Sequence, residues 1–372
     1  MLCVVFVTLS VFFVVFSCFL HKIKYLYVYL QYYLTFDALM GKKINFLLLT
    51  IICMFISSCK WQLKPENTRQ GEVNITVLRY DKLLMDYVSA NSFSALQKMN
   101  TDFSLQTKFL LEDVLELGKV DDPDINTKLR TYFSDTTLMK LDKTALSKYN
   151  DMKDLERNLT KGFKALKKEI PSLPVPVVYS QLSALNQSIV VGDSILGFSI
   201  DKYMGTDYPM YKNIFFDYQR RYMTRSRIVP DCFLFYLMRE YPFDWGGDRT
   251  LMEQIIYRGK IHWIIAKILG MSLDEEIGYS KFETQWAQEN RSRVWKFMVR
   301  TKQLESRDRE LFNVYLRPAS FNRYYGETSP GLLGIWLGTH LVDEYMQKNS
   351  QVTMLALLQD NQYKKILLDA LK

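Results

Sequence analysis

The chain has 372 residues, with 48 Lys and Arg against 40 Asp and Glu, and a net charge of +8 at neutral pH. Residues 1–58 hold four of the lysines and one aspartate, so residues 59–372 carry only +5, spread along the chain. This balance lacks a clustered basic footprint and excludes a nucleic-acid-binding protein. Beyond residue 59 Cys232 is the only cysteine, which excludes a disulfide framework and a cysteine-cluster metal site there.

Residues 40–58 have the features of a lipoprotein signal peptide. Lys42 and Lys43 precede an apolar run, 46–56, that is too short to span a membrane comfortably. Ile56-Ser-Ser-Cys59 then follows the lipobox pattern, in which small residues precede the cysteine that is acylated. We therefore expect a mature chain of residues 59–372 that is held to a membrane by lipid on Cys59. The alternative is an ordinary transmembrane anchor.

The segments on either side of this signal peptide have separate roles. Residues 1–39 begin with an almost wholly apolar run, which is out of place in front of a signal peptide. We expect translation to start at Met40, so that residues 1–39 are an upstream extension; the alternative is a true N-terminal membrane helix. Residues 59–72 are polar and contain Pro65 and Gly71, which predicts a tether.

After the tether, the pattern predicts few strands and many helices. The β-branched run 73–81 predicts a strand, and 82–166 is helical with a turn at 121–124. Residues 171–179 end in a strand, 188–200 predict a hairpin, and 201–249 are irregular except for a helix near 229–240. The later expected helices are 250–269, 280–299, 303–315, 333–348, 352–358 and 360–371. The predicted class is helix-rich α+β, one domain over 73–372, in which 82–168 form a helical subdomain.

The predicted helix 250–269 carries the most informative polar residues. Thr250 and Glu253 fit a capping box, and Arg258 and His262 lie one turn apart on the apolar side. A buried Arg needs a partner, so we expect a carboxylate beside it. The nearby candidates in sequence are Asp231, Glu240, Asp244 and Asp248. A structural salt bridge with a core histidine and a pocket for an anionic ligand both stay open, whereas His262 lacks the second imidazole of a zinc site.

Three other segments have a structural and a functional interpretation. Gly331, Gly334 and Gly338 favour close packing of helix 333–348 over a phosphate-binding loop, because the Gly-Lys-Ser/Thr ending is missing. His340 and the acidic run 274–276 are expected on a solvated surface. The aromatic and arginine-rich segment 211–227 predicts a partly buried loop with ion-paired arginines, and contact with glycan or lipid headgroups is the alternative.

The order and spacing of several segments resemble the GldB-type gliding-motility lipoproteins of Bacteroidota. These segments are Val77-Leu-Arg-Tyr-Asp81, 195–205, 250–262, 278–295 and Ser329-Pro-Gly-Leu-Leu-Gly-Ile-Trp-Leu-Gly338, together with the lipobox at Cys59. The resemblance implies a lipid-anchored cell-envelope protein of the gliding machinery with a protein partner. The residues after Cys59 lack an acidic run, so we expect a periplasm-facing position.

That family in turn resembles zinc peptidases with an HExxH helix, in which a later helix supplies a third ligand from a Glu-Gly pair. Here Arg258-Gly259 stands at the Glu-Gly position, and the HExxH helix falls near 231–240, which has no histidine. The resemblance implies a zincin-like helical core without metal ligands or cofactor. It implies a non-catalytic scaffold with a pseudo-active site of Arg258, His262, Glu240 and Asp231. The alternatives are an envelope peptide or glycan hydrolase that uses carboxylates, or a binder of a small anion at Arg258.

Overall fold

The computed structural model describes residues 73–244 and 249–372, which belong to one unit that runs from Arg69 to Lys372. The expected extension, signal peptide, tether and Cys59 lie outside these described residues. Within the two described ranges, none of the helices has the length and apolar character needed to cross a bilayer. The architecture is helix-rich α+β, which confirms the predicted class.

A mixed four-stranded sheet has the order β1-β2-β4-β3. β1 pairs with β2 and β2 with β4 in parallel, whereas β3 is antiparallel to β4. The last pair is the predicted hairpin, with Val190 opposite Gly197. The strands are β1 (Leu78–Arg79), β2 (Val177–Gln181), β3 (Ile189–Val191) and β4 (Ile195–Ser199).

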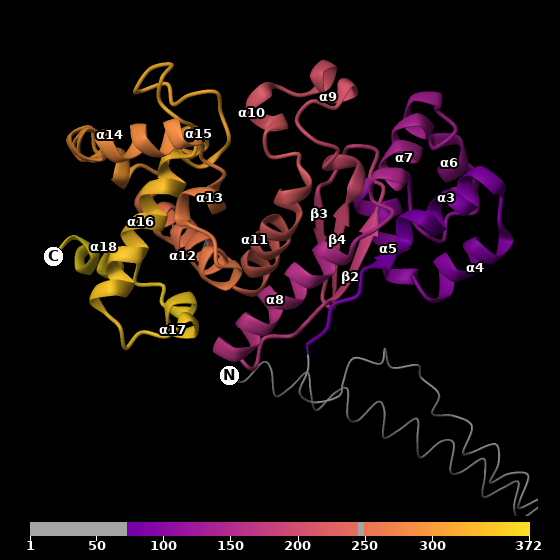
Figure 1. Ribbon diagram of the computed structural model, residues 1–372, viewed down its shortest axis with the longest axis horizontal. Helices are drawn as coiled ribbons and strands as arrows, with labels where there is room; N and C mark the ends of the chain where they lie inside the picture. The colour runs from indigo at the N-terminus through magenta and orange to yellow at the C-terminus, as the bar shows by residue number, and fades with distance from the viewer. Residues whose placement is uncertain (1–72, 245–248) are drawn as a thin grey trace, which may run out of the picture. The chain divides into compact units, whose positions relative to one another are not determined.

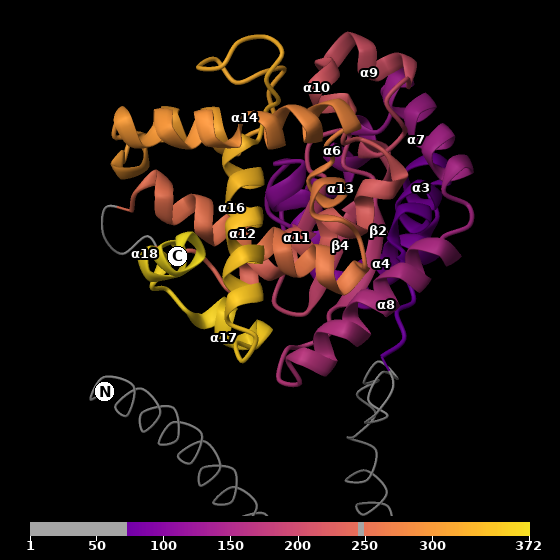
Figure 2. The same ribbon diagram turned by 60° about the vertical axis from the view of Figure 1, so that its left-hand side comes forward.

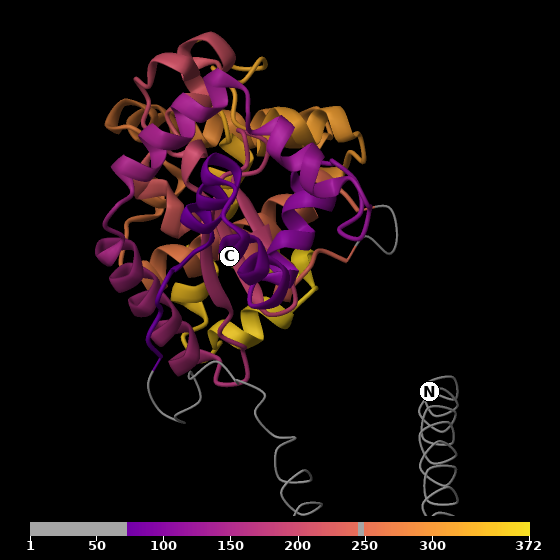
Figure 3. The same ribbon diagram turned by 90° about the vertical axis from the view of Figure 1, so that its right-hand side faces the viewer.

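Helices cover both faces of this sheet, and every residue of β4 is therefore buried. In Figure 1 the strands lie between α8 and α11 on one side and helices α3 to α7 on the other. Figure 3 looks from the side of these N-terminal helices, which are coloured indigo to magenta. Their bounds are α3 (Tyr80–Ala90), α4 (Phe93–Thr101), α5 (Ser104–Phe109), a π-helical turn η1 (Leu110–Val114), α6 (Ile125–Tyr132), α7 (Thr136–Lys148) and α8 (Lys153–Glu169).

The predicted strand 73–81 is wrong for most of its length. Only Leu78–Arg79 pairs in the sheet, and α3 already begins at Tyr80. The preceding backbone bonds to side chains of α8 instead of a strand: Ile75 N donates to Thr160 Oγ1 at 2.9 Å and Val77 N to Glu156 Oε1 at 2.9 Å. Because these donors are satisfied by a helix surface, the β-branched residues need no ladder.

The middle of the chain contains more helix than the sequence predicted. The 3₁₀ turn η2 (Ile200–Lys202) follows β4, and α9 (Pro209–Ile214) and α10 (Asp217–Arg220) are short helices in the stretch expected to be irregular. A second 3₁₀ turn, η3 (Arg225–Arg227), leads into α11 (Ile228–Glu240), which confirms the helix predicted near 229–240.

The C-terminal helices surround α12 (Leu251–Leu269), whose Thr250 and Glu253 form the predicted capping box. Figure 2 shows α14 crossing α16 beside α12. Glycines let α12 and α16 approach closely, because a Cβ at Gly338 would collide with the backbone of Ile255 and one at Gly259 with Gly338. The remaining elements are α13 (Leu273–Ile277), α14 (Lys281–Arg300), η4 (Gln303–Glu305), α15 (Arg309–Leu316), α16 (Leu333–Lys348), α17 (Met354–Gln359) and α18 (Tyr363–Leu371).

One predicted C-terminal helix is divided. The helix expected over 303–315 consists of η4 and then α15, which starts six residues late. The reason is a local cap: the side chain of Asp308 accepts a hydrogen bond from Glu310 N at 2.9 Å and fixes the new helix start there. The close packing expected from Gly331 and Gly334 is confirmed, because added Cβ atoms would press on Ala319 and Tyr315.

Candidate functional site

Five polar side chains meet beneath the surface where α11, α12 and α13 converge. They are Arg227 at the entry to α11, Asp231 on α11, Arg258 and His262 on α12, and Glu276 on α13. We call these five residues the charge cluster. Glu276 is completely buried, and only the edges of Arg227 and His262 reach solvent. Ionisable groups this deep need partners, so their hydrogen bonds define what the cluster can do.

Local turns bring Glu276 back to α12. Ser272 caps α13 by accepting a hydrogen bond from Glu275 N at 3.2 Å. The helix ends at Gly278, whose φ of 84° is left-handed and whose missing Cβ leaves room for the ring of Tyr222. This single tight helix turns the Glu276 carboxylate inward, where Oε2 lies 2.7 Å from His262 Nδ1.

Arg227 connects the acids of the cluster. Its Nη2 donates to Asp231 Oδ1 at 2.9 Å, one turn along the same helix, and its Nη1 donates to the backbone carbonyl of Glu276. The hydroxyl of Tyr203 donates to the other oxygen of Asp231 at 2.9 Å. Both Asp231 oxygens therefore have donors, and Arg227 links α11 to α13.

Arg258 and His262 sit one turn apart on α12, as their spacing predicted. Arg258 Nη2 lies 3.4 Å from His262 Nε2. A guanidinium group can only donate, so Nε2 is the acceptor and Nδ1 carries the proton that bonds Glu276. This tautomer turns the free lone pair of the imidazole toward a cation. Arg258 is half-buried, and its Nε has no hydrogen-bond partner.

Burial and neighbouring charge shift the pKa values of the cluster in opposite directions. Burial opposes the charge on Arg227, but Asp231 and Glu276 raise its pKa above the usual range. Burial raises the pKa of Asp231, while Arg227 and Tyr203 hold it down. Burial lowers the pKa of Arg258, and Tyr257 and Glu276 offset only part of that cost. Arg227 is thus the well-paired cation of the cluster and Arg258 the poorly paired one.

The structure corrects the predicted partners of Arg258. Glu240 lies at the end of α11, 2.6 Å from Arg239, and is not part of the cluster. Asp244 pairs with Arg249 at 2.8 Å, and Asp248 lies outside the described residues. Asp231 belongs to the cluster, but its salt bridge is with Arg227. The ion pair that we expected at position 258 is therefore formed at position 227.

Sequence analysis missed Arg227, Tyr203 and Glu276. The i, i+4 spacing of Arg227 and Asp231 was a usable signal for their ion pair. Glu276 had no such signal, since the acidic run 274–276 is typical of a solvated helix start. The surface position expected for Glu276 is wrong because α13 is one turn long and Gly278 folds that residue inward.

Two neighbouring predictions can also be compared with the structure. The arginines of 211–227 form ion pairs, as the favoured interpretation proposed: Arg221 with Glu283 at 2.6 Å and Arg225 with Asp154 at 2.5 Å, besides Arg227. His340 does not lie on an open face. Its Nε2 is 3.2 Å from Asp274 Oδ1, which also accepts from Trp336 Nε1 at 2.6 Å.

The chemistry available to the charge cluster follows from these contacts. A cavity of about 600 Å³ lies beside it and is lined by Arg227 and Asp274 among others. Across residues 73–244 and 249–372, no three His, Cys, Asp or Glu side chains are grouped so that they could hold a metal ion. The imidazole and both acids are already hydrogen-bonded to protein groups, so the cluster joins three helices.

Comparison with known proteins gives one match. A family model described as gliding motility protein GldB matches residues 60–371. Neither the curated proteins nor the solved structures contain a match.

Proposed function

The chain belongs to the GldB family of gliding motility proteins, and from this premise we propose that it is a lipid-anchored, non-catalytic scaffold of the cell envelope. The charge cluster is the observation that carries the non-catalytic part. Asp231 accepts from Arg227 and Tyr203, and His262 is held between Glu276 and Arg258. A general base or metal ligand needs a lone pair directed at substrate or metal, and the lone pair of His262 Nε2 faces a guanidinium group.

The same cluster supports descent from a peptidase-like fold. The helix that would carry HExxH corresponds to α11, and the helix with the Glu-Gly position corresponds to α12. These helices meet at the cluster, where Arg258 stands in place of a metal-binding acid and Gly259 contacts Gly338. Arg227 contributes a second positive charge between them. Two fixed cations give this region an electrostatic character opposite to that of a divalent-metal site.

Lipid anchoring at Cys59 explains how the domain is held in the envelope. The family match begins at residue 60, directly after the cysteine of the proposed lipobox. With residues 40–58 removed and the tether 59–72 extended, the folded domain can stand up to about 45–50 Å from the lipid. We place the domain in the periplasm, because no acidic run follows Cys59.

An exposed apolar surface supports the binding of a protein partner. The side chains of Ile214, Phe216 and Phe282 are 54%, 69% and 63% exposed. Their segments are held together by the salt bridge from Arg221 to Glu283 at 2.6 Å, and Figure 2 shows the start of α14 beside α10. We call these three residues the apolar patch. Large apolar side chains in water are costly and mark interaction sites when they gather.

The non-catalytic role is tested by comparing function with stability. Glu276→Gln keeps the shape of the side chain but removes its carboxylate, and Glu240→Gln makes the same change outside the cluster. Each variant is measured for thermal unfolding of residues 59–372 and for rescue of a strain that lacks the gene. A scaffold loses rescue only where the unfolding temperature falls. Loss of rescue by Glu276→Gln with an unchanged unfolding temperature would contradict the proposal and favour a carboxylate-based hydrolase.

The partner surface is tested by photo-cross-linking in the native host. A photoreactive residue is placed at Phe216, and a matched control is placed at Phe93 on α4, which is 77% exposed. The patch predicts a discrete cross-linked protein from position 216 that is absent from position 93. It also predicts that Phe216→Asp with Phe282→Asp abolishes rescue without lowering the unfolding temperature. Identical products from both positions would contradict a partner at this patch.

A second candidate, the binding of a small anion at Arg258, rests on one observation. The Nε of Arg258 is buried without a hydrogen-bond partner, and a cavity borders the cluster. An anion that fills this need would raise the unfolding temperature in proportion to its affinity. Thermal shifts with phosphate and small carboxylates, repeated in Arg258→Met, separate this candidate from the scaffold alone.

A further inference from the structure

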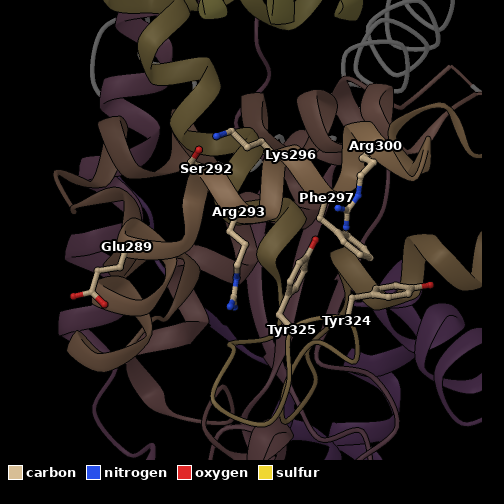
Figure 4. A pocket seen from close by; sticks show the side chains of 8 residues that line it. All are labelled: Glu289, Ser292, Arg293, Lys296, Phe297, Arg300, Tyr324 and Tyr325. Carbon is tan, nitrogen blue, oxygen red and sulfur yellow. The ribbon is translucent and has the colours of Figure 1, made fainter.

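A groove of about 960 Å³ runs between α14 and the loop after α15, away from the charge cluster. Figure 4 shows its side chains: Arg293 and Arg300 extend from α14 toward Tyr324 and Tyr325 of the loop, with Phe297 between them. The full lining is Glu289, Ser292, Arg293, Lys296, Phe297, Arg300, Tyr324 and Tyr325. Six of these residues come from one face of α14, where the i, i+3 and i+4 spacing puts them.

Aromatic rings form one wall of this groove, and they are fixed in place. The ring centroid of Phe297 lies 5.8 Å from that of Tyr324 and 5.6 Å from that of Tyr325. Behind them the buried hydroxyl of Tyr315 bonds Gln303 Oε1 at 2.5 Å and the hydroxyl of Tyr325 at 2.9 Å. Tyr324, stacked on Tyr315, is still 36% exposed. The groove therefore offers pre-organised ring surface to a ligand.

Two arginines flank these rings and have donors to spare. Arg293 and Arg300 are seven residues apart in α14, about 10 Å along its axis. Their guanidinium carbons lie 5.6 Å from the ring centre of Trp286 and 5.8 Å from that of Phe297. Within the described ranges neither arginine forms a salt bridge with a carboxylate, in contrast to those at positions 221, 225 and 227. Their charge is available to an incoming anion.

The other polar groups of the lining narrow the choice of ligand. Ser292, Tyr324 and Tyr325 supply hydroxyl groups, and Glu289 supplies a carboxylate. A uniformly acidic peptide would be repelled by Glu289, whereas sugar hydroxyls donate to it. A flat lipid surface does not fit a concave site. A chain that presents flat ring faces, many hydroxyls and spaced negative charges matches rings, mixed donors and acceptors, and separated cations together.

We propose that this groove binds a stretch of negatively charged glycan, with sugar rings stacked on Tyr324 and Phe297 and acidic groups on Arg293 and Arg300. This carbohydrate site is separate from the charge cluster and from the apolar patch. It gives the anchored domain a second point of attachment, to acidic polysaccharide in the envelope. It goes beyond the scaffold proposal and does not depend on it.

The charge part of the proposal is tested by titration calorimetry on residues 59–372. The probes are oligogalacturonate, neutral dextran, polyglutamate and phosphatidylglycerol vesicles. Oligogalacturonate should bind, with affinity that falls as salt rises, and the other three should bind at least about tenfold more weakly. Arg293→Gln with Arg300→Gln should weaken oligogalacturonate binding about tenfold or more. Arg130→Gln with Arg157→Gln removes the same charge from α6 and α8 and should leave binding unchanged.

The ring part needs a separate pair of variants. Tyr324→Ala should weaken oligogalacturonate binding about threefold or more with an unchanged salt dependence. Phe321→Ala removes a similarly exposed ring outside the groove and should have no effect. Unfolding temperatures confirm that each variant is folded. Tighter binding of polyglutamate or vesicles, or equal losses in both arginine pairs, would overturn the glycan site, and so would a complete lack of oligogalacturonate binding.

Discussion

The charge cluster and a second buried acid, Asp142, differ in what faces the carboxylate. In the cluster, Asp231 accepts hydrogen bonds from Arg227 and Tyr203. On α7, both oxygens of Asp142 are buried without any hydrogen-bond partner, and its charged neighbour is Asp201. Burial and that neighbour raise the pKa of Asp142 to about 8. The same burial is thus tolerated as an ion pair in one region and as a neutral acid in the other.

Asp201 shows what an acid gains from local donors alone. It accepts hydrogen bonds from Ser183 N at 3.0 Å and Leu185 N at 2.7 Å. Burial still raises the pKa of Asp201, while these bonds lower it. The comparison indicates that the chain supplies arginines where it links helices and leaves Asp142 to be neutralised by a proton.

Removal of Arg227 should break the first region and have the largest effect. Arg227→Met leaves Asp231 and the Glu276 carbonyl without their cation, so the free energy of unfolding should fall by about 3–5 kcal/mol. Urea denaturation of residues 59–372 measures this change. Arg227→Lys keeps the charge but not both hydrogen bonds and should lose less. A loss below about 1 kcal/mol for Arg227→Met would show that the cluster does not stabilise the fold.

Asp142→Asn should have the opposite sign, because it removes an unpaired acid. We expect a gain of about 1–3 kcal/mol near pH 7. The native state keeps the proton of Asp142 up to about pH 8. The unfolded chain releases it near pH 4, so wild-type stability should fall as pH rises from about 4 to 8, by up to about 1.4 kcal/mol per pH unit.

The pH dependence separates this explanation from a simple packing effect. The advantage of Asp142→Asn should be absent below about pH 4, grow up to about pH 8 and stay level above it. Asp113→Asn, at an exposed acid on η1, serves as the control and should show no such trend. A gain that is the same at every pH would contradict a raised pKa at Asp142.

Arg258→Met sharpens the contrast within the cluster itself. Arg258 has one long contact with His262, an unpartnered Nε and a pKa lowered by burial. Its replacement by an apolar side chain of similar length should change the free energy of unfolding by about 1 kcal/mol or less. Thermal and urea unfolding beside Arg227→Met test this difference. Equal losses at the two positions would place Arg258 on the same footing as Arg227.

The smallest effect is expected for an exposed pair, Lys128 with Asp124 at 3.0 Å on α6. Solvent screens these charges, so Lys128→Ala should change stability by about 0.5 kcal/mol or less. A loss above about 1 kcal/mol would show that burial is not what separates strong from weak pairs in this protein. The same unfolding assay provides the measurement.

Local signals made much of the fold predictable from sequence. The capping box at Thr250 and Glu253, the hairpin at Gly192 and the close packing of Gly338 each depend on residues near one another, and all are found in the structure. The strand expected over 73–81 failed because its backbone bonds to α8, about 80 residues away. A sequence pattern does not reveal such distant partners.

The candidate site was predictable only in part, for the same reason. Arg258 and His262 share a helix face, so their spacing indicated a joint site. Glu276 comes from a separate one-turn helix, and its inward direction depends on Gly278. The cation that pairs with Asp231 was assigned to position 258 because burial alone does not distinguish Arg258 from Arg227. Only their three-dimensional contacts separate the paired arginine from the unpaired one.

Zinc analysis of the purified mature domain tests most directly whether fixed positive charge has replaced a metal between α11 and α12. Residues 59–372 are equilibrated with excess zinc, desalted and analysed by mass spectrometry of the metal, with His262→Gln in parallel. We expect far less than one zinc per chain and the same trace in both proteins. One zinc per wild-type chain that is lost in His262→Gln would contradict this account.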